Sequence, residues 1–399
     1  MTKMSKKELI LATKPRYLKA SKKGKGKILD EFCENTGYDR NYTIQIFQAR
    51  YDYGRVVREG RMARKKIYSA DAMTAVTKVW ETLDYPCGIR LQPNLLTTLE
   101  SMIRFKEISV SETIMRQLKT ISARTIDRRL SKEREIRKLD RHRGTTKRGT
   151  MLKSAIPIRI TNWDTGKAGF MEMDTVAHNG GNPSGEFIYT LDMVDICFGW
   201  SEQYAVMGKG EIGVVNAVNV IRTGLPFNLI GLDSDSGGEF VNWHMVRYCE
   251  KEKLYFTRSR PDHKNDNAYV EQKNYTHIRR WLGYGRFDSP QQLIAINNLY
   301  RHELWLYNNF FLPVMKIKSK EKINNSICRK KYDQAKTPYH RLMASNQISN
   351  EQKQRLHNLY LTLNPVQLKK AINEKINKIQ KLSPKTNIDN ICLNKAEQT

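Results

Sequence analysis

The segment between residues 169 and 273 most constrains the fold, because strand-like and helical stretches follow one another there in a definite order. Three stretches rich in β-branched, aromatic and aliphatic residues come first, which is typical of strands, at 169–176, 186–196 and 200–207. Breaks at 180–183 and 198–199 contain glycine and suit short antiparallel connections. Helices and strands then alternate: a helix at 211–222, a strand at 228–232, a helix at 240–251, a strand at 254–257 and a helix that holds Glu271. This order predicts a mixed α/β domain.

Three carboxylates occupy positions in this order from which they can converge. Asp174 lies in the first predicted strand, Asp235 just after the fourth, and Glu271 on the helix that returns across the sheet. Carboxylates set into otherwise apolar elements repel one another and resist desolvation unless a positive charge compensates them. Two Mg²⁺ ions would do so, because a site made only of carboxylates prefers hard cations, and Mn²⁺ is expected to substitute. Such a pair of ions promotes phosphodiester chemistry, so the set predicts an enzyme that cuts and joins DNA.

Other carboxylates nearby keep alternatives open, since a single Asp is more often a turn or surface residue than a metal ligand. Asp195 precedes the turn at 198–199 and is interpreted as structural. Asp233 lies two residues before Asp235 and is the reserve candidate for that position, while Asp192 is a further alternative.

The charge of the chain indicates a polyanionic partner. Among 399 residues there are 69 Lys and Arg against 41 Asp and Glu, which gives a formal net charge of +28, and the positive residues recur along the whole length. This pattern favours nucleic acid held over an extended surface. A ribosomal or membrane-surface protein is the alternative, but the hydrophobic content of 39% favours folded domains.

The expected compartment follows from what the sequence lacks. No stretch approaches the ~20 apolar residues that cross a bilayer, and the N-terminus has no apolar signal-peptide region, so we expect a cytoplasmic, nucleoid-associated protein without a membrane partner. The six cysteines lie far apart with no Cys-x-x-Cys pair, which predicts reduced thiols rather than a zinc site or a disulfide framework.

Residues 1–66 are predicted to form a basic helix-turn-helix domain. The first 26 residues are lysine-rich, and 21–27 are expected to be a flexible lead-in. Gly37 ends a first predicted helix and Asp39 can cap a second. Each helix has an apolar stripe: Ile28, Leu29 and Phe32 in the first, Ile44 and Phe47 in the second. Two short helices around a glycine also occur in proteins that do not bind DNA, but the basic residues between 40 and 66 favour DNA binding.

Residues 67–131 are predicted to form a second helical, helix-turn-helix DNA-binding region. Apolar residues recur at helical spacing in its first helix, where Trp80 is expected in the core. In its last helix Ile126 and Leu130 fall on one face, and basic residues lie away from them: Arg124, Arg128 and Arg129. An apolar back and a basic front are what a groove-entering helix needs, although a solvated helix face would look similar.

The rest of the chain divides by composition. Residues 132–164 are charged and poor in apolar residues, which predicts a basic linker that tracks phosphates. The strand order described above is that of a ribonuclease-H-like domain, expected at 165–310. A small basic module at 311–345 and a helical tail at 346–399 follow, and the tail's apolar stripes serve either subunit contacts or packing on its own chain.

Positive residues also lie on or beside the predicted Glu271 helix. These residues are Lys264, Lys273 and Arg280. They can hold the DNA strand that is to be cut, or they can simply keep the surface of the helix in water.

Three motifs resemble the acidic triad of the integrase-core transposases, the family shared by retroviral integrases and many bacterial insertion sequences. They are Met173-Asp174-Thr175, Asp235-Ser236-Gly237-Gly238-Glu239-Phe240, and the run 265–274 that contains Glu271. The resemblance covers about residues 165–310, and the upstream helix-turn-helix units and residues 310–339 are also similar to an insertion-sequence transposase. Two positions depart from the family pattern without removing a carboxylate: Ser236, where Asn is usual, and Asn267, where Gly is common.

The resemblance implies a multidomain DDE transposase, with N-terminal all-α helix-turn-helix units, a central α/β ribonuclease-H-like integrase core, and a small basic C-terminal module with a helical tail. Asp174, Asp235 and Glu271 would hold two metal ions, water would cut the transposon end, and the freed 3′-hydroxyl would join target DNA. The implied partners are double-stranded DNA, from transposon ends and target, and further copies of the chain in a homo-oligomer. Two rivals remain, a ribonuclease-H-like nuclease without strand transfer and a transposase-derived DNA-binding regulator.

Overall fold

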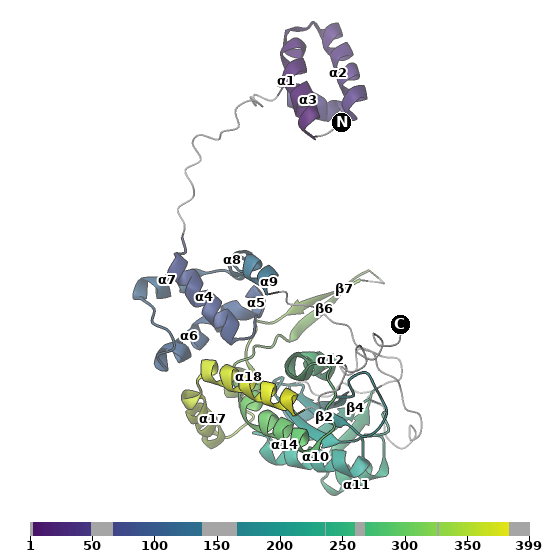
Figure 1. The fold of residues 1–399 in the computed structure, drawn as a ribbon, viewed down its shortest axis with the longest axis vertical. Helices are drawn as coiled ribbons and strands as arrows, with labels where there is room; N and C mark the ends of the chain where they lie inside the picture. Colours follow the sequence, from purple (N-terminus) through teal and green to yellow (C-terminus); the bar gives the residue numbers. More distant parts are fainter. Residues whose placement is uncertain are drawn as a thin grey trace, which may run out of the picture. The chain divides into compact units, whose positions relative to one another are not determined.

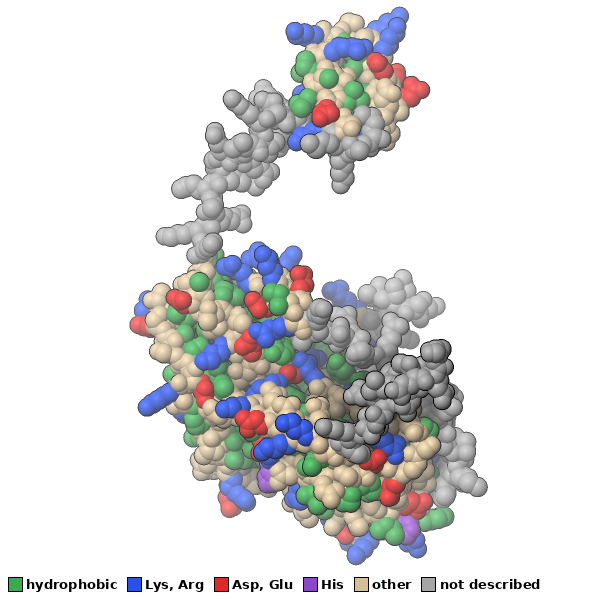
Figure 2. Space-filling model, in the orientation of Figure 1, with side chains coloured by type: hydrophobic (Ala, Val, Ile, Leu, Met, Phe, Trp, Pro, Cys, Tyr) green, Lys and Arg blue, Asp and Glu red, His purple; other side chains and the backbone are tan. Residues whose placement is uncertain are grey.

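The computed structural model divides the chain into two compact units, residues 1–67 and 68–399 (Figure 1). It describes residues 3–48, 67–137, 166–235, 237–259, 268–324 and 327–382. The domain divisions predicted beyond residue 67 therefore lie within one compact unit. Lys and Arg side chains are spread over the visible face of each unit (Figure 2). Within the described ranges, every helix is too short or too polar to cross a membrane.

The first unit is a bundle of three helices, α1 (Lys3–Lys19), α2 (Lys22–Thr36) and α3 (Arg40–Gln48). Gly37 ends α2 in the left-handed conformation, with φ of 68°, and Oδ1 of Asp39 caps α3 by accepting the backbone N–H groups of Asn41 and Tyr42. Both predicted helices are confirmed. The predicted flexible lead-in is wrong, because α1 buries Ile10 and Tyr17 against the other two helices and α2 already begins at Lys22.

The second unit begins with a group of short helices. They are α4 (Ala70–Thr82), α5 (Gly88–Leu91), the 3₁₀ turn η1 (Gln92–Asn94), α6 (Leu95–Arg104), α7 (Glu112–Thr120), α8 (Ala123–Arg129) and α9 (Ser131–Ile136). The hydroxyls of Ser69, Ser111 and Ser122 cap α4, α7 and α8. Trp80 is fully buried, as predicted.

The predicted linker begins later than residue 132, because α9 continues the helical group. In α9 the guanidinium of Arg134 pairs with Asp127 of α8 at 2.9 Å, so this arginine is held by the protein rather than presented along a linker. The rest of the predicted linker, 138–165, lies outside the described residues.

A five-stranded sheet forms the centre of the second unit. Its strands are β1 (Phe170–Ala177), β2 (Ile188–Asp195), β3 (Ser201–Met207), β4 (Gly231–Ser234) and β5 (Tyr255–Arg258). The order is β3-β2-β1-β4-β5, with β1, β2 and β3 antiparallel in succession and β1, β4 and β5 parallel. The strands predicted from the sequence are confirmed, with ends that differ by a few residues.

Helices cover both faces of this sheet. Residues 171 and 173 of β1 pack with α10 (Glu211–Gly224) and α11 (Trp243–Lys251) in one apolar cluster. Residues 172 and 174 point the other way, toward the helical run formed by α12 (Ala268–Lys273), the π-helical η2 (Asn274–Arg279) and α13 (Arg280–Leu282). The same side carries α14 (Pro290–Leu299), η3 (Tyr300–Leu304) and α15 (Trp305–Phe310).

The C-terminal part has a separate two-stranded ribbon and three helices. The ribbon is β6 (Ile317–Asn324) with β7 (Ile327–Tyr332), and the helices are α16 (Pro338–Met343), α17 (Asn350–Thr362) and α18 (Pro365–Lys381). Of the two interpretations of the tail, its described part packs on its own chain, because Leu363 and Ile372 are buried in the cluster that includes α4 and α15.

Candidate active site

Asp174 lies in the middle of β1, on the side of the sheet that faces α12. Its Oδ2 accepts a hydrogen bond from Nδ2 of Asn274 at 2.6 Å, and its Oδ1 accepts the N–H of Thr175 at 2.7 Å. Loss of hydration raises the pKa of Asp174 to about 7, and the charge of Asp235 adds to the rise. A carboxyl that is this difficult to ionise is one that a nearby cation would stabilise.

Asp192 is the cross-strand partner of Asp174 on β2, so two carboxylates share this face of the sheet. Asp192 is fully buried, Oδ1 accepts from Nε2 of Gln203 at 2.9 Å, and Oδ2 has no hydrogen-bond partner among the described residues. Burial raises the pKa of Asp192 to about 7, against the opposing effect of Lys273. Because Asp192 has no exposed surface, it lies behind the site and not on its accessible side.

Asp235 follows β4 directly, at the carboxyl end of a strand parallel to β1. Its Oδ1 accepts the N–H of Gly237 at 2.9 Å, and loss of hydration together with the charge of Glu239 raises the pKa of Asp235. A Cβ at Gly237 would lie 2.7 Å from Oε2 of Glu239 and 2.9 Å from Oδ1 of Asp235, so a larger residue there would push these carboxylate oxygens aside. The loop after β4 thus holds two carboxylates close together.

Glu239 links this loop to β1. Its Oε1 accepts from Nζ of Lys209 at 2.7 Å and from Oγ1 of Thr175, the residue after Asp174, at 2.9 Å. Burial acts to raise the pKa of Glu239, but the hydrogen bond and charge of Lys209 hold it below the usual range. Neither Glu239 nor Lys209 was predicted from the sequence to have a role, although Glu239 belongs to the motif that begins at Asp235.

Glu271 lies on α12, which is fixed to β1 at its first turn. There the N–H groups of Tyr269 and Val270 donate to Oε2 of Glu172 at 2.9 and 3.2 Å. Glu271 is exposed and precedes Asn274 by three residues, so both lie on the side of the helix that meets Asp174.

The structure brings Asp174 and Asp235 together but does not complete a triad. In the part of the chain that it describes, no group of three or more acidic, His or Cys side chains is arranged to hold a metal, so Glu271 stays outside the pair. The pair itself fits a divalent cation, because two adjacent carboxylates with raised pKa values are oxygen ligands whose ionised forms a cation would stabilise. Sequence reasoning missed Asn274, whose only signal was its place one turn beyond Glu271.

The predicted DNA-binding residues fall into separate places. On α8 Ile126 is buried, and the three arginines are exposed: Arg124, Arg128 and Arg129. Lys264 lies outside the described residues. Arg280 forms an ion pair with Asp84, in the loop after α4.

Lys273 requires a correction. Only 5% of its surface is exposed, and its ammonium lies 3.1 Å from Nε2 of His277, so it is not placed to clamp a DNA strand. Burial lowers the pKa of Lys273 to about 7. The burial of Lys273 could not be predicted from the sequence, because α12 is short and its inward face is itself polar. A short helix with a polar inward face has no apolar stripe that would distinguish buried from exposed positions.

The alternative aspartates are structural. Asp195 accepts the N–H groups of Gly169 at 2.9 Å and Phe198 at 2.6 Å, so it ties the start of β1 to the turn before β3, as interpreted from the sequence. Asp233, the reserve candidate, is buried within β4 and accepts a hydrogen bond from Thr257 of β5.

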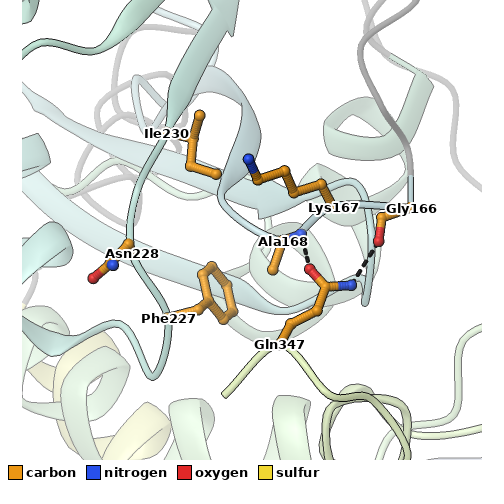
Figure 3. Close-up of a pocket in the computed structure, with 7 residues that line it drawn as sticks. All are labelled: Gly166, Lys167, Ala168, Phe227, Asn228, Ile230 and Gln347. Atoms are coloured by element: carbon orange, nitrogen blue, oxygen red, sulfur yellow. Dashed lines mark hydrogen bonds between the residues drawn. The ribbon is translucent and has the colours of Figure 1, made fainter. Parts of the chain in front are cut away.

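A cavity of about 430 Å³ is lined by residues other than the acidic pair. Figure 3 shows the side chains that line it. Its lining residues are Gly166, Lys167, Ala168, Phe227, Asn228, Ile230 and Gln347. Gln347 bridges one wall, because its Nε2 donates to the carbonyl of Gly166 at 2.6 Å and its Oε1 accepts the N–H of Ala168 at 2.5 Å. These residues precede β1 and β4, so the cavity lies at the ends of those strands opposite to Asp235.

The strand order, with three antiparallel strands followed by two parallel ones, defines the fold class of this protein as a ribonuclease-H-like α/β core. The chain is 33% identical over 328 residues to the uncharacterized protein y4rM of Sinorhizobium fredii, across 81% of this chain and 91% of that protein, and it belongs to the same family. No family model matches the chain. The catalytic core domain of BIV integrase, a solved structure, aligns with 43% of this chain and 91% of its own at 14% identity and a TM-score of 0.27, so the fold assignment rests on the strand order instead.

Proposed function

We propose that this protein is a DDE transposase. It binds transposon-end DNA, cleaves it by metal-dependent phosphodiester hydrolysis and joins the 3′-hydroxyl ends to target DNA. One observation supports the proposal most strongly. Asp174 in β1 and Asp235 directly after the neighbouring strand β4 lie close together, on the side of the sheet that is covered by the helical run holding Glu271. Two Mg²⁺ ions, for which Mn²⁺ can substitute, would activate the attacking oxygen and stabilise the leaving one when bound.

The protein's own residues prepare the acidic pair for this chemistry. Asn274 and the N–H of Thr175 each hold one oxygen of Asp174, which fixes the direction of its carboxylate. Gly237 holds Asp235, and the Lys209–Glu239 ion pair places a positive side chain beside it. We assign Glu271 as the third metal ligand, because it lies on the same side of its helix as Asn274.

DNA recognition is assigned to the exposed arginines of α8 and to the first unit. Arg124, Arg128 and Arg129 project from a helix whose opposite side is buried, which supports insertion into a groove of double-stranded DNA. Because the two ends of one transposable DNA element must be held together during the reaction, the active form is expected to be a homo-oligomer on DNA.

The proposal is tested with labelled terminal DNA and a target plasmid, using the wild type, Asp235→Asn and the control Asp71→Asn. Asp71 is an exposed carboxylate in the first turn of α4, so its variant makes the same chemical change away from the site. We expect wild type and control to cut and join, and Asp235→Asn to bind DNA but lose cleavage by at least about 10²-fold. Unchanged cleavage by Asp235→Asn would refute the assignment. Cutting without joining by the wild type would indicate a nuclease, and binding without cutting a regulator.

A further inference from the structure

A second cavity, of about 70 Å³, lies where three segments of the second unit meet. One wall comes from the loop after α4 and from Arg90 of α5, another from the helical run that holds Glu271, and a third from residues 312–314. Neither member of the acidic pair lines it. The cavity has room for several water molecules and its walls are largely polar, so it can hold a small hydrophilic ligand.

The charged residues that line this cavity are unbalanced. One of them is acidic, Asp84, and three are cationic: Arg90, Lys273 and Arg280. Asp84 is already shared, because Arg280 forms an ion pair with it and Nζ of Lys369 lies 2.5 Å from its Oδ1. Arg90 and Lys273 have no ion-pair partner among the described residues, yet they lie close enough for their charges to repel each other. The cavity therefore has an excess of positive charge.

Lys273 is the most buried of these cations, and its one hydrogen-bond partner among the described residues is neutral. An ammonium can only donate, so Nε2 of His277, which lies 3.1 Å away, is the acceptor. The ring proton of neutral His277 is then on Nδ1, which lies 2.8 Å from Oγ1 of Thr276. His277 thus gives the ammonium a hydrogen bond but no negative charge, and a buried cation without a compensating charge is costly.

The nearest carboxylate behind Lys273 supplies this charge only in part. Asp192 of β2 attracts Lys273, but the two side chains form no ion pair, and Oδ2 of Asp192 has no hydrogen-bond partner among the described residues. Asp192 does not line the cavity, whereas Lys273 does. An anion in the cavity can therefore provide the negative charge that Asp192 does not.

We propose that this cavity binds a small tetrahedral oxyanion, with inorganic phosphate as the expected ligand, held by Arg90 and Lys273. A guanidinium offers parallel N–H donors whose spacing matches the oxygens of phosphate, and an ammonium adds a compact positive charge. The DNA backbone also contains phosphates, but a cavity of about 70 Å³ has room for the phosphate group and not for the sugars attached to it. This site goes beyond the proposed transposase function and does not depend on it.

The bound ion would join two parts of the fold. Arg90 belongs to α5 in the first group of helices, whereas Lys273 ends α12, the helix that holds Glu271. Contacts from one ion to both side chains would replace the repulsion between them with a shared attraction. We therefore expect phosphate to stabilise the folded chain through these two residues.

The test measures binding of inorganic phosphate to the full chain by isothermal titration calorimetry, without Mg²⁺ and with chloride keeping the ionic strength constant. The variants are Arg90→Gln, Lys273→Met and the control Arg116→Gln. Arg116 is exposed on α7, where it pairs with Glu112. We expect wild type and control to bind one phosphate per chain, and the affinity to fall at least about tenfold in Arg90→Gln and in Lys273→Met. Sulfate should compete for the site.

Thermal unfolding separates a ligand-binding arginine from a structural one, and it does not need Lys273→Met to fold. Without phosphate, Arg90→Gln should melt no lower than wild type, because the change removes a positive charge from a group that has too many. Saturating phosphate should raise the melting temperature of wild type and of Arg116→Gln, because a ligand that binds only the folded state stabilises it. The melting temperature of Arg90→Gln should rise less.

Three results would each overturn the proposal: no saturable phosphate binding by wild type, equal affinities of wild type and Arg90→Gln, or an equal loss of affinity in Arg116→Gln. A DNA duplex that displaces phosphate from wild type and itself binds Arg90→Gln more weakly would place a backbone phosphate in the cavity, which also contradicts a free ion. Failure of the proposed function has a different result. A wild type that binds phosphate through Arg90 but never cleaves DNA would contradict the transposase assignment and leave the ion site standing.

Discussion

At the level of single residues, the pKa of Asp174 sets the pH at which the acidic pair can accept a cation. Loss of hydration and then the charge of Asp235 raise that pKa to about 7, so at pH 6 most of the carboxyl is protonated and a metal must displace the proton. We expect calorimetry to show an Mg²⁺ affinity that is constant well above pH 7 and about tenfold weaker at pH 6. Asn274→Ala removes a hydrogen bond that lowers this pKa, so its midpoint should lie at higher pH. An affinity that does not change between pH 6 and pH 8 would contradict the assignment of Asp174 as a ligand. The sequence allowed Asp174 to be predicted from its place in an apolar strand. It did not allow Asn274, because nothing local shows that a residue 100 positions further on contacts it.

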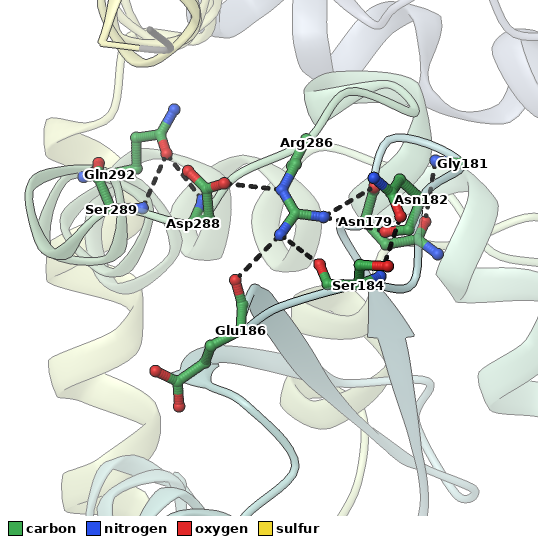
Figure 4. Close-up of polar contacts among 9 residues, drawn as sticks. All are labelled: Asn179, Gly181, Asn182, Ser184, Glu186, Arg286, Asp288, Ser289 and Gln292. Atoms are coloured by element: carbon green, nitrogen blue, oxygen red, sulfur yellow. Dashed lines mark hydrogen bonds and ion pairs between the residues drawn. The ribbon is translucent and has the colours of Figure 1, made fainter.

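At the level of elements, Arg286 fixes the connection between β1 and β2 (Figure 4). Its guanidinium donates to the carbonyls of Asn182 at 2.9 Å and Ser184 at 2.8 Å, and its Nε donates to Asp288 at 2.7 Å. We expect Arg286→Ala to destabilise the protein by about 1–3 kcal/mol and to speed hydrogen exchange in 179–186, because these contacts are charge-assisted but partly exposed. Arg247→Ala, which removes one contact between a side chain and a carbonyl on the surface of α11, serves as the control; equal exchange in the two variants would show that Arg286 does not order the loop. The sequence predicted this connection, since glycines and alternating apolar residues are local signals. The arginine that holds it comes from a distant segment and leaves no such signal.

At the level of the whole molecule, Asp84 joins three segments of the second unit. It lies in the loop after α4, pairs with Arg280 in the last segment of the Glu271 helical run, and accepts a hydrogen bond from Nζ of Lys369 on α18 at 2.5 Å. These segments are far apart in sequence, so the ion pairs between them could not be predicted from the sequence. The helices that carry the charged residues could be predicted, because their apolar residues recur at helical spacing. Asp84→Asn is a clean test, because Asp84 has φ of 61° and Asn tolerates this left-handed conformation, so the change removes charge with little backbone strain. Burial already lowers the pKa of Lys369, and the loss of its acidic partner leaves a largely buried ammonium uncompensated. We expect a loss of about 2–4 kcal/mol in the free energy of unfolding, read from the urea midpoint, against less than about 0.5 kcal/mol for Asp71→Asn on the surface of α4. Because Arg280 belongs to α13, the last segment of the helical run that holds Glu271, DNA cleavage should fall in Asp84→Asn even at temperatures where the variant stays folded. Full cleavage by the folded variant would show that the three segments are coupled in stability alone.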